Sequence, residues 1–206
     1  MKYKTEQEAL EAVKKNGLEL KYVKNQTISI CYFALRDDGL ALKYVRNQTL
    51  NLCHIAVIQN GLALKYVKVQ TLNVCKLAIQ NNATALMYVK EQTNELCLMA
   101  LKRWGMALKH VKKQTSRLCE IAVRQDAAAI QYVVKKTLKL NKIAVKRNGF
   151  TIIHIKNQTE EICRIAIKRD WQAIKYVKNK TLKLKKLALK QSELQSMWVH
   201  KMELPF

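Results

Sequence analysis

The chain has 206 residues, 49% of them apolar, and its 38 Lys and Arg outnumber 15 Asp and Glu to give a net charge of +23. The apolar fraction suffices for a continuous core, but no apolar run reaches the roughly 18 residues that a membrane span needs. The first residues are charged and lack the apolar stretch of a signal peptide, so we expect a cytoplasmic protein and not a secreted one. A charge of this size attracts polyanions, namely nucleic acid, anionic membrane or acidic protein.

Nine threonines recur every 22 residues, and the six cysteines and five glycines keep a constant distance from them. With each threonine counted as position 0 of a repeat, the cysteines occupy position +4 and the glycines position −10. A fixed period of this length is typical of a solenoid. The sequence therefore predicts an all-α solenoid of about nine helix-turn-helix repeats, wound into a right-handed type of superhelix, which forms a single array over residues 1–206. Each repeat is expected to begin at a threonine that caps its helix: Thr5, Thr27, Thr49, Thr71, Thr93, Thr115, Thr137, Thr159 and Thr181.

The first repeat carries Glu6, Glu8 and Glu11 at positions where later repeats are apolar. Thr5 and Glu8 also have the spacing of a capping box, in which the two side chains satisfy free backbone N–H groups of the first turn. The end repeats of a solenoid need a polar outer face. This repeat is therefore predicted to be the N-terminal cap.

The regular repeats that follow share one pattern, seen clearly from Thr49 onward. The apolar positions after Thr49 recur at helical spacing, so a helix is expected to run to the Asn or Asp at position +11, here Asn60. A second, shorter helix follows, with Leu62, Leu64 and Val67 among its apolar residues. Each repeat thus reads as an αα-hairpin. Alanine at position +7 of every repeat and cysteine at +4 are expected to be small core residues that let neighbouring helices approach closely.

The last repeat begins at Thr181, and beyond its helix Glu193, Gln195 and Ser196 replace the usual Gly, Ala and Leu. We expect these residues to form the C-terminal cap. Polar caps at both ends indicate a complete array and favour a monomer over end-to-end stacking, although the sequence leaves the oligomeric state open.

The repeat, clearest at residues 40–57 and 61–79, resembles a family of 22-residue helical repeats found in giant DNA viruses of amoebae and in some protists and bacteria, a domain of unknown function. The resemblance implies a viral source and a place in the cytoplasm of the infected cell or in the virion, and it brings no catalytic residue. The chain departs from the pattern mainly in its second half: Lys136 and Lys180 replace Gln, Asn141 and Lys185 replace Cys, and His110 and His154 replace Tyr.

Basic residues recur at positions −3 and −6 of the predicted short helix. We expect these two positions to share one helix face, so that stacking makes a stripe of positive charge. Two interpretations stay open: a solvated face that suits the helix C-terminal dipole, or an electrostatic track for a polyanion. The candidate polyanion-binding residues at these positions are Lys24, Arg46, Lys68, Lys90, Lys109, Lys112, Lys156, Lys175 and Lys178.

The second half of the chain is the more basic one. Residues 101–206 hold 25 Lys and Arg against 7 Asp and Glu, a net charge of +18, whereas residues 1–100 hold 13 against 8, a net charge of +5. Basic pairs at positions +9 and +10 lie next to the aromatic residues Trp104, Phe150 and Trp171, a combination that suits phosphate contact plus base stacking. It also suits ordinary helix ends and packing against the next repeat. The candidate pairs are Lys102 with Arg103, Lys146 with Arg147, and Lys168 with Arg169.

No catalytic site, metal site or cofactor site is predicted. The cysteines are one stacking step apart, too far for disulfides, and form no Cys-x-x-Cys motif. The Asn-x-Thr sequences are read as turns, and no nucleophile or carboxylate pair keeps a fixed distance from the histidines. We expect a non-enzymatic binding module with no small-molecule substrate, which binds an anionic polymer such as nucleic acid. The alternatives are a scaffold for an acidic viral or host protein and a structural component of a virion.

Overall fold

A computed structural model describes the backbone of residues 2–202 and the side chains of residues 2–196. This part of the chain is an α-solenoid of about nine repeats, as predicted, in which long α-helices alternate with short 3-10 helices and no strand occurs. In chain order the helices are α1 (Glu6–Lys15), η1 (Gly17–Tyr22), α2 (Ile28–Asp37), η2 (Gly39–Tyr44), α3 (Leu50–Gln59), η3 (Gly61–Tyr66), α4 (Leu72–Asn81), η4 (Ala83–Tyr88), α5 (Asn94–Arg103), η5 (Gly105–His110), α6 (Ser116–Gln125), η6 (Ala127–Tyr132), α7 (Leu138–Arg147), η7 (Gly149–His154), α8 (Glu160–Arg169), η8 (Trp171–Tyr176) and α9 (Leu182–Met202).

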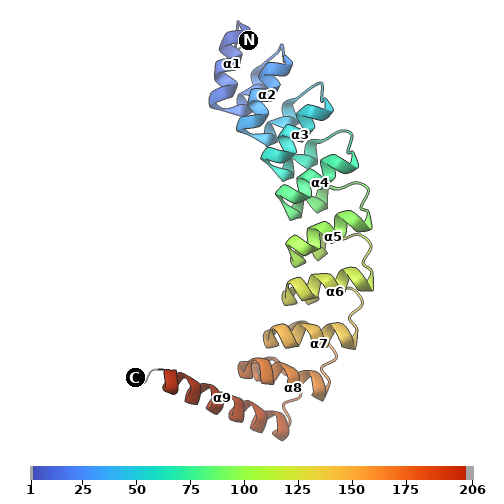
Figure 1. The fold of residues 1–206 in the computed structure, drawn as a ribbon, viewed down its shortest axis with the longest axis vertical. Helices are drawn as coiled ribbons and strands as arrows, with labels where there is room; N and C mark the ends of the chain where they lie inside the picture. The colour runs from blue at the N-terminus through green and yellow to red at the C-terminus, as the bar shows by residue number, and fades with distance from the viewer. Residues whose placement is uncertain (1, 203–206) are drawn as a thin grey trace. The chain divides into compact units, whose positions relative to one another are not determined.

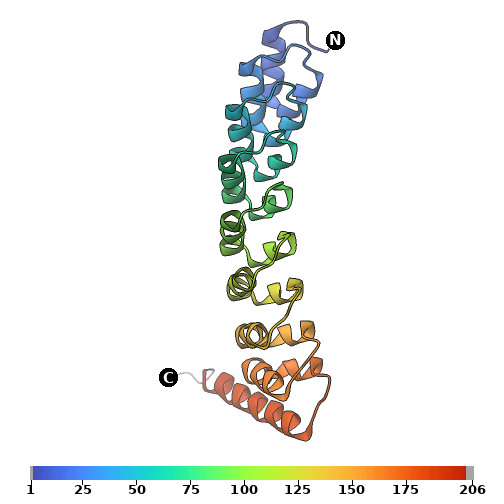
Figure 2. The same ribbon diagram turned by 90° about the vertical axis from the view of Figure 1, so that its right-hand side faces the viewer.

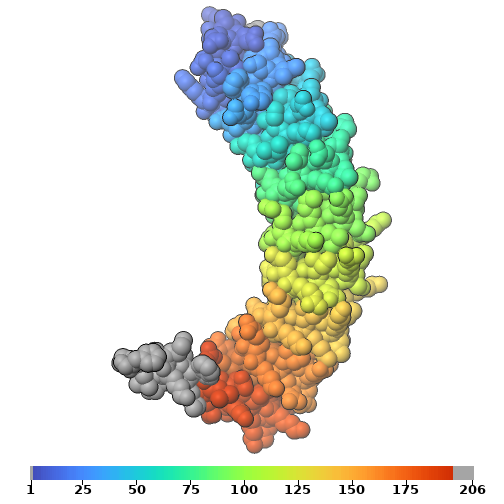
Figure 3. Space-filling view, in the orientation of Figure 1, coloured from blue at the N-terminus to red at the C-terminus, as the bar shows by residue number. Residues whose placement is uncertain are grey.

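The chain divides into two compact units. Unit 1 comprises Met1–Arg103 with His110–Lys112, and unit 2 comprises Trp104–Lys109 with Lys113–Phe206. Within each unit the α-helices of successive repeats lie side by side in one layer, and the 3-10 helices form a second layer (Figures 1 and 2). The space-filling view shows that repeats follow one another in sequence order within each unit (Figure 3). That the two units form one continuous array stays a prediction.

All nine repeat threonines cap an α-helix. The Oγ1 atom of Thr49, for example, accepts a hydrogen bond from the backbone N–H of Leu52 at 3.3 Å, and the other eight threonines do the same with the residue three places on. This confirms the predicted caps. In the first repeat Glu8 completes the cap by accepting from the N–H of Lys4 at 2.9 Å, one residue earlier than a regular capping box requires.

The short helix is a 3-10 helix, so the expectation of an αα-hairpin was wrong in this respect. Its backbone bonds span three residues, as from the N–H of Ala63 to the carbonyl of Asn60 at 2.9 Å. Six residues between a polar cap and a bend are too few to profit from α-helical geometry, and short connecting segments commonly adopt the tighter form. Because the helix ends at position −5, the residues at −3 lie beyond it in a bend. Positions −3 and −6 therefore do not share a helix face, contrary to the prediction.

The Asn or Asp at position +11 ends one helix and begins the next. Its side chain caps the 3-10 helix, as where Asn60 Oδ1 accepts from the N–H of Leu62 at 3.0 Å. The glycine that often follows, here Gly61, has no positive φ. It is glycine because an added Cβ would lie 2.4 Å from the carbonyl oxygen of Ala78 in the next repeat. Close approach between repeats, and not turn geometry, requires the small residue.

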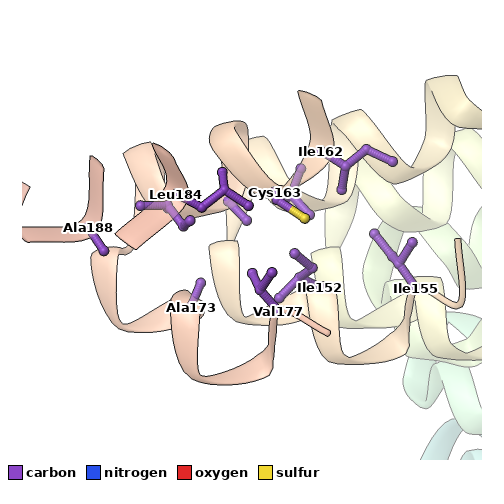
Figure 4. Close-up of a cluster of buried hydrophobic side chains, with 11 residues drawn as sticks. Ile152, Ile155, Ile162, Cys163, Ala173, Val177, Leu184 and Ala188 are labelled. Carbon is purple, nitrogen blue, oxygen red and sulfur yellow. The ribbon is translucent and has the colours of Figure 1, made fainter. Parts of the chain in front are cut away.

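The core runs between the two layers, as the cluster in unit 2 illustrates (Figure 4). There Ile152 and Val177 from the 3-10 layer meet Ile162 and Cys163 from α8. All six cysteines are buried and free, as predicted, and burial raises the pKa of each thiol. The alanines at position +7 are buried in every repeat after the first, in which Ala12 is half-buried.

The last helix departs from the repeat pattern. The residues at positions +11 and +12 are Ser192 and Glu193, which cannot form the Asn-Gly type of junction, and α9 continues through them to Met202. Glu193, Gln195 and Ser196, the predicted polar cap residues, are exposed on this helix.

Candidate polyanion interface

The basic residues at position −3 in unit 1 form a connected series, which we call the basic row: Lys24, Arg46, Lys68, Lys90 and Lys112. Each side chain after Lys24 reaches back one repeat and donates to the backbone carbonyl of the preceding member. Arg46 Nη1 donates to Lys24 at 2.7 Å, and the ammonium groups of Lys68, Lys90 and Lys112 donate to the member before them at 2.8 to 2.9 Å. All five residues are exposed. The sequence missed this contact, which makes the row part of the joint between repeats.

A glutamine at position −1 of each regular repeat makes two hydrogen bonds with the backbone of the next repeat, beside the residues of the basic row. Gln70 Nε2 donates to the carbonyl of Tyr88 in the next repeat at 2.9 Å, and its Oε1 accepts from the N–H of Lys90 at the same distance. Gln26, Gln48 and Gln92 make equivalent pairs in unit 1, and Gln114 and Gln158 do so in unit 2. We call each such pair of glutamine bonds an amide staple. The recurrence of glutamine at position −1 was the signal in the sequence that could have predicted these staples.

A second polar contact joins repeats at the opposite end of the α-helix. The Gly39 N–H donates to Gln59 Oε1 at 2.7 Å, and Gln59 Nε2 donates to the carbonyl of Asp37 at 2.9 Å. Asn81 makes the corresponding pair with Gly61 and Ile58. Where both contacts form in unit 1, side-chain amides hold one repeat to the next on both sides of the core.

Several lysines at position −6 lie over aromatic rings. The ammonium of Lys43 is 4.7 Å from the ring centroid of Tyr44, and that of Lys65 is 5.6 Å from Tyr66. In unit 2, Lys109 Nζ lies 5.1 Å from the Trp104 ring. These contacts orient the lysines while leaving them exposed.

In unit 2 the predicted basic positions form a shorter series. Lys178 Nζ donates to the carbonyl of Lys156 at 3.2 Å, but position −3 of the repeat before Lys156 is Val134, which interrupts the series. Lys175 lies at position −6 of the same repeat as Lys178, and all three lysines are exposed.

The basic pairs at the ends of the α-helices are also exposed: Lys102 with Arg103 in unit 1, and Lys146 with Arg147 and Lys168 with Arg169 in unit 2. Arg169 Nε donates to the carbonyl of Arg147 at 3.2 Å, which repeats the backward contact of the basic row. The aromatic residues beside these pairs are engaged with the protein. Phe150 packs edge-to-face on Tyr176 with 6.1 Å between ring centroids, and Trp171 is half-buried. Packing within the protein therefore explains much of why aromatic residues occur beside the basic pairs.

Few carboxylates neutralise these cations. Lys76 pairs with Glu95 at 2.6 Å and Lys142 with Glu161 at 2.7 Å, and neither of these lysines is a candidate residue. No member of the basic row lies within 4 Å of a carboxylate in the described part of the chain. An ammonium has three donors: Lys68 and Lys90 each use one and retain two, and Lys112, which donates to the carbonyls of Lys90 and Val89, retains one. The row can therefore contact an external anion without breaking the joint between repeats.

Among the side chains of residues 2–196, no group of three or more His, Cys, Asp and Glu lies together as a metal site would require. No described helix combines the length and apolar character needed to cross a bilayer. Comparisons of the chain with family models, with curated proteins and with solved structures found no match. The resemblance to the viral repeat family therefore stays a prediction.

Proposed function

We propose that the protein is a non-enzymatic module that binds an anionic polymer, such as nucleic acid, through its exposed basic surface. The observation that carries the proposal is the basic row. Its cations recur once per repeat, stacked helices being about 8–10 Å apart, and they have no carboxylate partner among the described residues. Because the side chains of Arg46, Lys68, Lys90 and Lys112 are already held by the preceding repeat, binding a polyanion costs less side-chain entropy than it would for free lysines.

The charge distribution supports the same function. Residues 101–206 carry a net charge of +18, and their candidate residues are exposed. Contacts with phosphates through ammonium and guanidinium groups do not read sequence, so the expected binding is strong at low salt and insensitive to base sequence.

The test is fluorescence anisotropy of labelled single-stranded and duplex nucleic acid, titrated with the protein across a salt series. The logarithm of the affinity should fall with the logarithm of salt by roughly 0.7 to 0.9 per phosphate contacted. The triple variant Lys68→Gln, Lys90→Gln, Lys112→Gln should lower the slope by about 2. A matched triple, Lys4→Gln, Lys14→Gln, Lys15→Gln, removes the same charge outside the row. Equal effects of the two triples, or binding that ignores salt, would refute a role for the row.

A second candidate is a scaffold for an acidic protein, favoured by exposed apolar residues at position +1 of the repeats. Ile28 is 72% exposed, Leu50 50% and Leu72 48%, all in unit 1. Apolar contacts beside cations are typical of protein interfaces and add nothing to phosphate binding. A polyglutamate competitor separates the two functions: displacement of nucleic acid at equal charge concentration favours the scaffold, and resistance favours the nucleic-acid module.

A further inference from the structure

The junction between the repeats of α7 and α8 differs from the others. Position −1 is Lys136 in place of glutamine, and position +4 is Asn141 in place of cysteine. The glutamine of a regular junction donates to one backbone carbonyl of the next repeat and accepts from one N–H. The Lys136 ammonium instead donates to the carbonyl of Val133 in its own repeat at 3.0 Å. The amide staple is therefore missing here.

The missing staple leaves hydrogen-bonding groups of the next repeat free. The backbone N–H of Lys156 has no acceptor among the described residues, whereas the equivalent N–H of Lys178 donates to Gln158 Oε1 at 2.8 Å. The Lys156 ammonium also makes no hydrogen bond in the described part of the chain, whereas the equivalent ammonium of Lys178 donates to the carbonyl of Lys156 at 3.2 Å. Two donors at one residue are thus available.

Asn141 adds a buried polar group to the same place. The residue is only 7% exposed, and its Oδ1 is buried without a hydrogen-bond partner. No described group pairs with its Nδ2 either. A buried polar atom without a partner destabilises the fold, and the cysteine found at this position in six other repeats has no such cost. Of the two amide atoms only Nδ2 can donate to an anion, and a half-turn of the amide brings this donor to the position of the unpaired oxygen.

These groups border one cleft of about 460 Å³ within unit 2. Its lining includes Lys136, Asn141, Lys156 and Thr159, and it contains no carboxylate. The nearest acidic residues of the sequence are engaged elsewhere: Glu161 pairs with Lys142 at 2.7 Å, and Glu160 lines a different cleft with Arg164 and three lysines of α9. Two lysines, one of them with a free backbone N–H, and a buried asparagine therefore line a single space that has no acidic residue in its lining.

We propose that this cleft binds a single phosphate group, free or as the head of a phosphomonoester. The Lys136 and Lys156 ammonium groups supply the charge, and the Lys156 N–H and the Asn141 amide supply fixed hydrogen bonds, the combination that proteins use for phosphate. The cleft is larger than the ion, so a substituent of the phosphate fits against Leu138 and Ile162. The proposal concerns one junction and goes beyond polymer binding by the basic row.

The test is an NMR titration of the ¹⁵N-labelled full chain with sodium phosphate at constant ionic strength, maintained with sodium chloride. The Lys156 amide should show a saturable shift, while the Lys178 amide, already bonded to glutamine, serves as the internal reference. Glycerol phosphate and a short oligonucleotide distinguish a monoester from a polymer phosphodiester. The proposal expects glycerol phosphate to bind at least as tightly as inorganic phosphate. A linear, unsaturated shift, or equal shifts of both amides, would overturn it.

Two variants restore what the other repeats carry and should therefore fold. Lys136→Gln replaces the cation and supplies an acceptor for the Lys156 N–H, and Asn141→Cys removes the buried amide. Each should weaken phosphate binding at Lys156 about tenfold or more. Lys135→Gln removes the same charge from the neighbouring exposed residue and should change the affinity less than twofold. Undiminished binding in the double variant, or an equal loss in Lys135→Gln, would contradict the site.

Discussion

Gln70 joins two repeats through backbone groups that no other side chain satisfies, so replacing it with methionine should destabilise the protein. Methionine keeps the length and the packing of the side chain but can neither donate nor accept the two short bonds. The carbonyl of Tyr88 and the N–H of Lys90, each 2.9 Å from the glutamine amide, lose their partner. A net contribution of about 1 kcal/mol for each bond predicts a loss of about 2 kcal/mol in the free energy of unfolding.

The matched control is Gln80→Met, the same substitution on the exposed end of α4, where the structure assigns the side chain no hydrogen bond. Its effect should stay within about 0.5 kcal/mol. Urea unfolding followed by circular dichroism measures both, with the slope m as a check that the extent of unfolding is unchanged. If Gln70→Met and Gln80→Met have the same midpoint, the amide staples do not hold the repeats together and the reasoning fails.

Three further outcomes follow from single contacts. Gly61→Ala should lower the free energy of unfolding by about 2 kcal/mol, because the added Cβ would lie 2.4 Å from the Ala78 carbonyl oxygen. The measurement is the urea midpoint, which should fall. An unchanged midpoint would mean that the repeats can move apart here without loss of stability. Burial raises the pKa of the Cys75 thiol above the ordinary 9.0. The buried neutral thiol therefore contributes fully to the free energy of unfolding below pH 9.0, and this contribution is lost as the pH rises through the raised pKa of the folded protein. Ellman's reagent at pH 8 should accordingly react far more slowly with the native chain than with the chain in urea, and equal rates would contradict the burial. Desolvation and the charge of Lys136 together lower the pKa of His154 below 6.5, so Lys136→Gln should raise it in an NMR titration of the imidazole, and a fall would contradict this cause.

The sequence alone predicted the features that depend on local chemistry. The period of 22 residues, the nine threonine caps and the buried cysteines follow from residue type and spacing within one repeat, and the structure confirms them. The exposure of the candidate basic residues could likewise be predicted, because lysine and arginine side chains are almost never fully buried unless they are paired. Whether these residues bind a polyanion stays a prediction.

The tertiary structure decided what the basic and amide side chains touch. Lys68 and Gln70 both bond to backbone atoms of a neighbouring repeat. Every residue has a backbone carbonyl, so the sequence does not indicate which residue accepts these bonds. The 3-10 form of the short helix depends in the same way on packing and chain length between caps, which propensity does not determine. Only the stacked repeats show that Lys156, whose N–H lacks its glutamine acceptor, and the buried Asn141 line the same cleft.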